Sequence, residues 1–204
     1  MNSYNDFSET HFDILKELGN IGSGHAVTAL AKMLGKKVDM PVPKVNLVEF
    51  KDIASFVGGP ENIIVGILVS ISGDINGIMM FLLKMDSANR LVDIIMGGME
   101  RPKDTFDEMA QSAIQEIGNI MISSYVGSLA GLINKVIKPS IPYLSIDMAN
   151  AILSVPAIEF GKVADRVLFI ESGFEVDMVN VSGYFILVPD MPSFNSILRA
   201  LGVE

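Results

Sequence analysis

DILKELGNI, residues 13–21, is the stretch of this chain that decides its fold, because its polar pattern occurs a second time. The second copy is SAIQEIGNI, residues 112–120, and the offset between the copies is 99 residues (112 − 13). The same offset separates Pro43 from Pro142 (142 − 43). An internal repeat of this length indicates that one supersecondary unit is present twice.

Each copy lies in a long stretch with helical periodicity. Apolar residues recur every three or four positions over Thr10–Leu34 and over Phe106–Ile133, so two long helices are predicted. Pro-flanked segments and β-rich stretches follow. The expected hairpin strands are Ile63–Ser72 with Gly77–Leu83, and Arg166–Glu171 with Gly183–Val188. Each half then closes on a short helix, at Ser87–Met96 and Ser193–Leu201.

This order of elements predicts an α/β (α+β) fold built by internal duplication with pseudo-two-fold symmetry. The sheet is expected to be largely antiparallel, with the two long motif-bearing helices packed on it. We predict a single domain over residues 1–204, made of repeats of about 8–100 and about 105–204. Gly97–Asp104, which contains two glycines and a proline, is the expected join.

Composition excludes several classes of function. The net charge of −9 disfavours nucleic acid as a partner. There is no cysteine and only two histidines, so a thiolate metal site, a cysteine nucleophile and a disulfide are absent, and no metal-ligand spacing is found. No unbroken apolar run approaches the roughly 18 to 20 residues that cross a bilayer, and a signal sequence is not evident. A cytoplasmic protein without a membrane partner is expected.

The repeated polar residues share one helix face. At about 100° per residue, Asp13, Glu17 and Asn20 fall within roughly 60° of arc. The apolar positions centre away from that arc, so Glu17 and Asn20 are expected to project outward. Gly19 and Gly118 lower helix propensity, by about 1 kcal/mol each relative to Ala, which suggests close packing at these positions.

An Asn beside a Glu has limited chemistry of its own. The amide of Asn cannot act as a general acid or base near neutral pH, but it can hold a water in line with a phosphorus, as a Gln does in GTPases. The carboxylate of Glu can pair with a cation. The residues alone leave two interpretations open: an ordinary solvated helix face, or a protein-facing site that is present twice.

The doubled pattern [Asp/Ser]-x3-Glu-x2-Asn-x22-Pro resembles the signature of the CheC/CheX/FliY family of chemotaxis phosphatases. The residues that carry the resemblance are Asp13, Glu17, Asn20 and Pro43 in the first copy, and Ser112, Glu116, Asn119 and Pro142 in the second. Two motifs argue against the CheX type, which has one. The chain ends soon after the second repeat, which argues against the FliY type, so the CheC type is expected.

The resemblance implies a concrete activity. The substrate would be phosphorylated CheY, a response regulator with an aspartyl phosphate and its own Mg²⁺, and this chain would need no cofactor. Asn20 and Asn119 would each position the water that attacks the phosphate. Glu17 and Glu116 would bind the regulator's active-site lysine. The role of Asp13 and Ser112 is less defined, and Pro43 and Pro142 would serve the fold.

The resemblance also implies a second partner, the receptor deamidase CheD. The segment Ser145–Ile152 resembles a short helix that family members use for this docking, and Asp147 is the residue that carries the expectation. An ordinary acidic residue at a helix N-terminus is the alternative. The rival to the phosphatase hypothesis is a non-catalytic adaptor that binds CheD and phosphorylated CheY. A structural component of the flagellar switch is a third interpretation.

Overall fold

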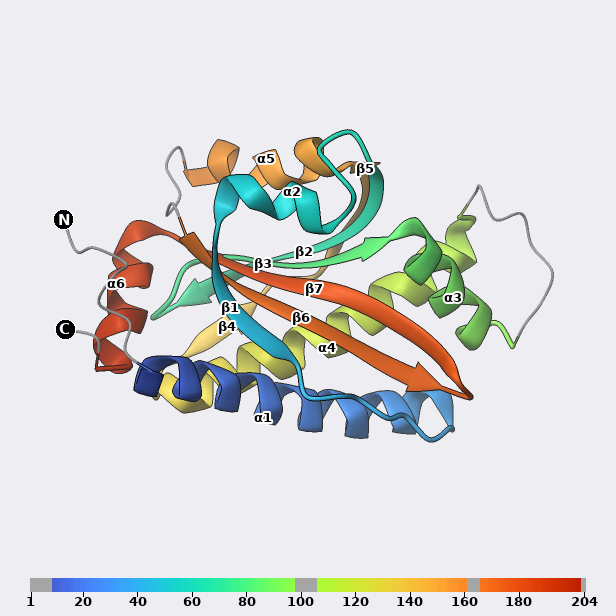
Figure 1. Cartoon of the computed structure of the whole chain (residues 1–204), viewed down its shortest axis with the longest axis horizontal. Coiled ribbons are helices and arrows are strands. Elements are labelled where there is room, and N and C mark those ends of the chain that lie inside the picture. Colours follow the sequence, from blue (N-terminus) through green and yellow to red (C-terminus); the bar gives the residue numbers. More distant parts are fainter. Residues whose placement is uncertain (1–8, 98–105, 161–165, 203–204) are drawn as a thin grey trace.

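Two helices of 26 residues carry the two copies of the motif (Figure 1). The computed structural model describes residues 9–97, 106–160 and 166–202. Helix α1 spans Glu9–Leu34 and helix α4 spans Glu108–Ile133, within two residues of the predicted bounds. The Asp107 carboxylate caps α4 by accepting a hydrogen bond from the backbone N–H of Ala110 at 2.8 Å.

The remaining elements follow one order in both halves, except for a 3-10 helix described in the first half and strand β4 described in the second. The first half has β1 (Lys44–Glu49), a 3-10 helix (Phe50–Asp52), α2 (Ile53–Phe56), β2 (Ile63–Gly73), β3 (Gly77–Lys84) and α3 (Met85–Ile95). The second half has β4 (Ile137–Pro139), β5 (Tyr143–Met148), α5 (Ala149–Phe160), β6 (Arg166–Val176), β7 (Val179–Pro189) and α6 (Met191–Ala200). Both predicted hairpins and both predicted short helices are present. Residues 98–104 of the predicted join lie outside the described residues.

The strands of the described residues form one antiparallel sheet in the order β1-β6-β7-β3-β2, with β4 and β5 both paired to β2 at the far edge. Lys44 of β1 lies opposite Glu171 of β6, and Tyr143 of β5 lies opposite Leu68 of β2. Lys44 and Tyr143 differ by 99 residues, which is the offset between the two copies of the motif. Leu68 and Glu171 differ by 103 residues, which is the offset between the starts of β2 and β6 (166 − 63). The pairing register is therefore the same in both halves, and β1 and β5, the strands that precede each hairpin, each pair with the hairpin of the other half.

The two halves meet at the centre of this sheet. Strands β3 and β7, each the second strand of its hairpin, pair antiparallel with Met80 opposite Ile186. The pseudo-two-fold axis therefore passes between them. The predicted fold, an antiparallel sheet with helices built by duplication, is confirmed. The division into one domain of two repeats with the bounds given above stays a prediction.

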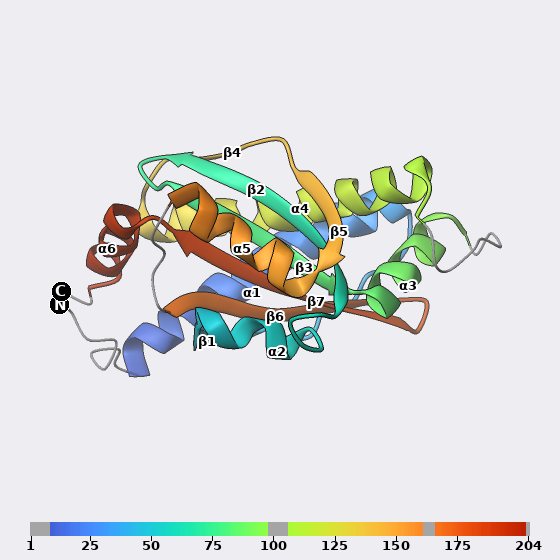
Figure 2. The same cartoon turned by 90° about the horizontal axis from the view of Figure 1, so that it is seen from above.

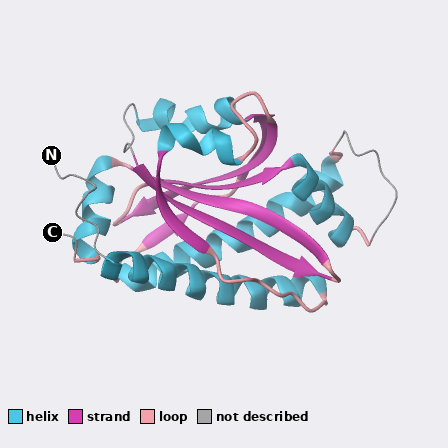
Figure 3. Cartoon of the chain, in the orientation of Figure 1, coloured by secondary structure: helices cyan, strands magenta, loops and turns pink. Residues whose placement is uncertain are grey.

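The sheet is covered on both faces, as Figures 1 and 3 show. One hydrophobic cluster lies between the sheet and the long helices α1 and α4, and the other lies beneath α2 and α5. Strands β2 and β3 are buried almost continuously, which is typical of strands with a helical layer on each side. This arrangement leaves one face of each long helix outside the sheet contact.

Helix α4 is long and apolar enough to cross a membrane, judged by length and composition only. Half of its most apolar 18-residue window is buried inside the structure. Residues on its inner face, such as Ile114, Met121 and Leu129, belong to the main hydrophobic cluster. We therefore interpret α4 as a core helix.

Three hydroxyl groups meet between α1, α4 and β6. The phenol of Tyr125 donates a hydrogen bond to Ser172 Oγ at 3.1 Å and lies 3.2 Å from Ser23 Oγ, which donates to the carbonyl of Gly19 at 2.7 Å. Burial raises the pKa of the Tyr125 phenol above its ordinary value of 10.0, and the hydrogen bonds with Ser172 and Ser23 partly oppose this. The ring of Tyr125 packs against Gly22, where an added Cβ would lie 2.6 Å from Cδ1 of the ring.

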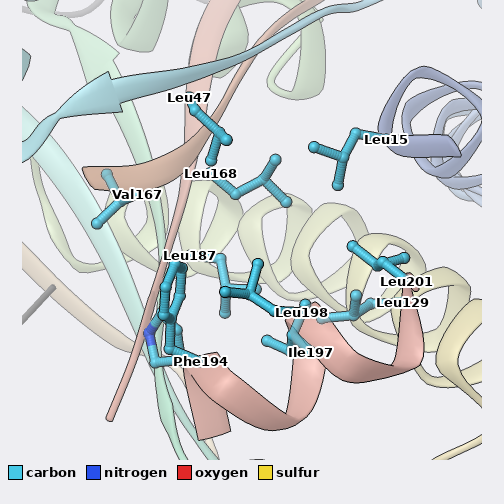
Figure 4. A pocket seen from close by; sticks show the side chains of 11 residues that line it. Leu15, Leu47, Leu129, Val167, Leu168, Leu187, Phe194, Ile197, Leu198 and Leu201 are labelled. Atoms are coloured by element: carbon cyan, nitrogen blue, oxygen red, sulfur yellow. The ribbon is translucent and has the colours of Figure 1, made fainter. Parts of the chain in front are cut away.

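Helix α6 closes one end of the sheet over a small apolar cavity of about 30 Å³ (Figure 4). Leu15 of α1, Leu47 of β1 and Ile197 of α6 are among the residues that line it. A cavity of this size holds about one water, and an apolar lining offers water no partners. The cavity is a packing defect and not a candidate substrate site.

The turn between β6 and β7 holds two residues in the left-handed region, Asp177 (φ 51°) and Met178 (φ 63°). A two-residue turn of this type favours glycine, because a side chain in this conformation costs roughly 1–2 kcal/mol. Met178 is 87% exposed, so few contacts offset that cost. We expect Met178→Gly to raise the free energy of unfolding by about 0.5–1 kcal/mol in a denaturant titration.

Met109→Gly is the matched control for this turn. Met109 is also exposed but lies in the first turn of α4, where glycine weakens a helix. A loss of about 0.5–1 kcal/mol is expected there. If both substitutions changed the free energy of unfolding in the same direction, the explanation from the turn conformation would be contradicted.

Candidate functional site

The first Glu/Asn pair lies on the solvent face of α1. Leu15, Ala26 and Leu30 of this helix are buried in the main cluster, whereas Glu17 and Asn20 are exposed. The outward projection predicted from the helical arc is therefore what the structure shows. Because the helix packs on the sheet through its other face, both polar side chains are accessible to a partner.

Gly19 explains how the first motif proline is positioned. A Cβ added at Gly19 would lie 2.9 Å from Cγ of Pro43 and 2.8 Å from Cγ2 of Val45. The start of β1 therefore packs directly on the helix, one residue away from Asn20, and Pro43 is buried in this contact. The close packing predicted for Gly19 is present. Asp13, the first residue of the motif, is exposed and pairs with Lys16 at 3.0 Å.

The second Glu/Asn pair lies on α4 beside an open hollow of about 500 Å³. Glu116 is exposed and Asn119 is half-buried. Ser112 and Pro142, the other two motif positions, line the same hollow. The structure therefore brings all four residues of the second motif around one concavity. The full lining is Ser112, Gln115, Glu116, Asn119, Pro139, Ser140, Ile141 and Pro142.

The second motif proline is held differently from the first. Gln115 Nε2 donates a hydrogen bond to the carbonyl of Pro142, which ties α4 to the connection before β5. The equivalent residue in the first repeat is Lys16, which pairs with Asp13 instead. Gly118 again marks close packing, since an added Cβ would lie 2.8 Å from Ile67 Cγ1 of β2.

Asp147 lies on a strand, whereas the sequence predicted a helix at this position. The predicted docking helix over Ser145–Ile152 is wrong in its first half, because Ser145–Met148 belongs to β5 and α5 begins at Ala149. Pairing with β2, in which Asp147 lies opposite Ile64, fixes this segment as a strand. The Asp147 carboxylate is exposed and accepts a hydrogen bond from the N–H of Met148 at 2.7 Å. It is thus an acidic group on an edge strand.

Sequence reasoning missed four residues of the hollow: Gln115, Pro139, Ser140 and Ile141. For Ile141 a signal existed, because the residue directly before each motif proline is aliphatic in both repeats, Val42 and Ile141. Gln115 carried no such signal, since its partner Pro142 is distant in sequence.

The arrangement can position groups but offers little reactive chemistry. Among the described residues, no three His, Asp or Glu side chains are grouped so that they could hold a metal ion. A carboxamide that is exposed at Asn20 and half-buried at Asn119, with an exposed carboxylate three residues earlier, can orient a water and pair with a cation. The remaining catalytic groups would have to come from the molecule that docks there.

Comparisons with known proteins agree with this description. The model of the CheC-like family matches residues 11–47 and 109–146. The first match covers most of α1 and part of β1, and the second covers most of α4, β4 and part of β5. The chain is 31% identical over 208 aligned residues to the CheY-P phosphatase CheC of Bacillus subtilis (strain 168), and the match covers 100% of both chains.

Two solved structures show the same fold. The structure of Thermotoga maritima FliY is similar with a TM-score of 0.73 and 24% identity, over 96% of this chain and 98% of that one. A chain of the CheX–CheY–BeF3–Mg²⁺ complex from Borrelia burgdorferi is similar with a TM-score of 0.50 and 15% identity, over 83% of this chain and 96% of that one. The resemblance inferred from the doubled motif is confirmed by the full-length match. The chain belongs to the CheC-like family.

Proposed function

We propose that this chain is a chemotaxis phosphatase that hydrolyses the aspartyl phosphate of phosphorylated CheY. One observation carries the proposal: a Glu and an Asn three residues apart project from the solvent face of each long helix, and the second pair borders a hollow of about 500 Å³. The name of the full-length relative, a CheY-P phosphatase, supports the same substrate. The solved complex of CheX with CheY from Borrelia burgdorferi supports docking of a CheY-like regulator on this fold.

The Asn side chains would do the chemical positioning. The amide of Asn20 or Asn119 would be inserted next to the phosphorylated aspartate. Its oxygen would accept a hydrogen bond from a water, and its nitrogen would donate a second hydrogen bond. Such a water would be held in line with the phosphorus, which lowers the barrier through geometry. No covalent intermediate on this chain is needed.

The Glu side chains would align the complex. Glu17 and Glu116 precede each Asn by about one helical turn and would pair with the active-site lysine of the regulator. The regulator would contribute its own Mg²⁺, which stabilises charge on the phosphoryl group, so this chain would need no cofactor. Asp13 and Ser112 would flank the docked partner, and Pro43 and Pro142 would fix the connection beside each helix.

We also propose a second partner, the deamidase CheD, at the β5 edge that carries Asp147. The exposed Asp147 carboxylate is available to a partner from that edge. A protein with these two partners would act in the cytoplasm, as a component of a two-component signalling pathway.

The test is phosphate release from an excess of phosphorylated CheY in the presence of Mg²⁺ and catalytic amounts of this chain. We expect each molecule of the chain to release many phosphates, because nothing in the proposed reaction consumes it. Binding of phosphorylated CheY without faster phosphate release, with and without CheD, would overturn the proposal in favour of an adaptor.

A further inference from the structure

An exposed aliphatic side chain precedes each motif proline. Val42 directly precedes Pro43 and Ile141 directly precedes Pro142, so the two positions keep the 99-residue offset (141 − 42). Val42 is 75% exposed and Ile141 is 87% exposed. Neither side chain belongs to the two hydrophobic clusters of the described residues. Packing among the described residues therefore does not explain an aliphatic residue at either position.

The backbone around Ile141 is fixed on both sides. The N–H of Ser140 donates to the carbonyl of Ser70 at 2.8 Å, and the N–H of Ser70 donates to Ser140 Oγ at 3.1 Å. On the other side Gln115 binds the carbonyl of Pro142. The connection is thus tied to β2 and to α4, and an exposed side chain on a preorganised backbone loses little entropy when a partner covers it. Figure 2 shows the connection between β4 and β5 at the outer edge of the sheet.

Each aliphatic residue is placed beside a Glu/Asn pair. Ile141 lines the same hollow as Glu116 and Asn119, so a molecule that reaches Asn119 from solvent also meets Ile141. In the first repeat, Pro43 packs on Gly19 next to Asn20, and Val42 directly precedes Pro43, so Val42 lies near the first Glu/Asn pair.

We propose that Val42 and Ile141 are apolar anchors through which the response regulator docks at the two Glu/Asn sites, an inference that rests on the proposed function. The polar pairs would align the partner, and burial of the aliphatic side chains would supply affinity. Removing apolar surface from water is the main source of binding free energy at the centre of such contacts. Val42 and Ile141 are therefore binding residues and not catalytic ones.

The test measures affinity and turnover separately in a Val42→Ser/Ile141→Ser variant. The affinity probe is CheY activated with beryllofluoride and Mg²⁺, and turnover is measured with phosphorylated CheY. We expect the Kd and the KM to rise about tenfold or more while kcat stays within about twofold, since an anchor contributes equally before and during the reaction. Thermal stability should not change, because both side chains are already exposed.

Ile158→Ser is the matched control. Ile158 is 77% exposed, but it lies on α5, which covers the face of the sheet opposite α1 and α4. The Ile158→Ser variant should bind activated CheY and release phosphate as the wild type does. If the wild type releases phosphate and the double serine variant binds as tightly as it does, this inference fails and the proposed function stands. If the wild type binds no activated CheY, both fail.

Discussion

The Asn20→Ala/Asn119→Ala variant is expected to lose phosphatase activity by about 100-fold or more while it still binds CheY. The reason is that the two amides are the groups proposed to hold the attacking water, whereas the carboxylates that align the partner remain. Asn20 is exposed and Asn119 half-buried, so their truncation should leave the fold intact. Phosphate release and affinity for beryllofluoride-activated CheY are the two measurements.

Asn76→Ala/Asn180→Ala is the matched control, because these two asparagines are also exposed but lie on the hairpins. That variant should keep wild-type turnover. Each single variant at Asn20 or Asn119 should retain the contribution of the other site, so their rates apportion activity between α1 and α4. Undiminished turnover in the Asn20→Ala/Asn119→Ala variant would rule out water positioning by these residues.

Tyr125→Ala is expected to lower the free energy of unfolding by about 3–5 kcal/mol. The ring is almost fully buried, fills the space that Gly22 leaves on α1, and packs on Phe185 with ring centroids 4.4 Å apart. Its removal creates a cavity and takes a hydrogen-bond partner from Ser172. Chemical denaturation followed by circular dichroism measures the loss.

Tyr125→Phe separates the ring from its hydroxyl. Only the hydrogen bonds are lost in this variant, so a smaller loss of about 1–2 kcal/mol is expected. Gly22→Ala provides a second check. Its new methyl group would collide with the ring of Tyr125, but it would not collide with the smaller side chain in a Tyr125→Ala variant. Gly22→Ala should therefore be much less harmful in the Tyr125→Ala background, and equal costs in both backgrounds would contradict the packing explanation.

Local patterns predicted the elements that depend on local physics. The two long helices follow from apolar periodicity, and the hairpins follow from apolar strands around short turns such as Gly73–Gly77. The outward direction of Glu17 and the close packing at Gly19 could be inferred because a helix fixes the angle between residues.

Long-range pairing could not be inferred in the same way. The segment around Asp147 alternates apolar and polar residues from Leu144 to Met148, which is a strand pattern, but that pattern does not say that β2 is the strand it pairs with. The exchange of β1 and β5 between the halves, and the hollow beside Asn119, arise from contacts between residues distant in sequence. Ile141 shows the limit well, because an aliphatic residue in a sequence is expected to be buried, and only the structure shows that it is exposed.

The exchange of β1 and β5 between the halves constrains how the chain can fold during synthesis. Strand β1 pairs with β6, and Lys44 lies opposite Glu171, which is synthesised 127 residues later (171 − 44). Contacts of such separation slow folding, and until β6 leaves the ribosome β1 has no partner for its backbone N–H and C=O groups. An unpaired strand is a template for association with other chains. Newly made copies should therefore be most prone to aggregation, and most dependent on chaperones, in the interval before the second hairpin is complete.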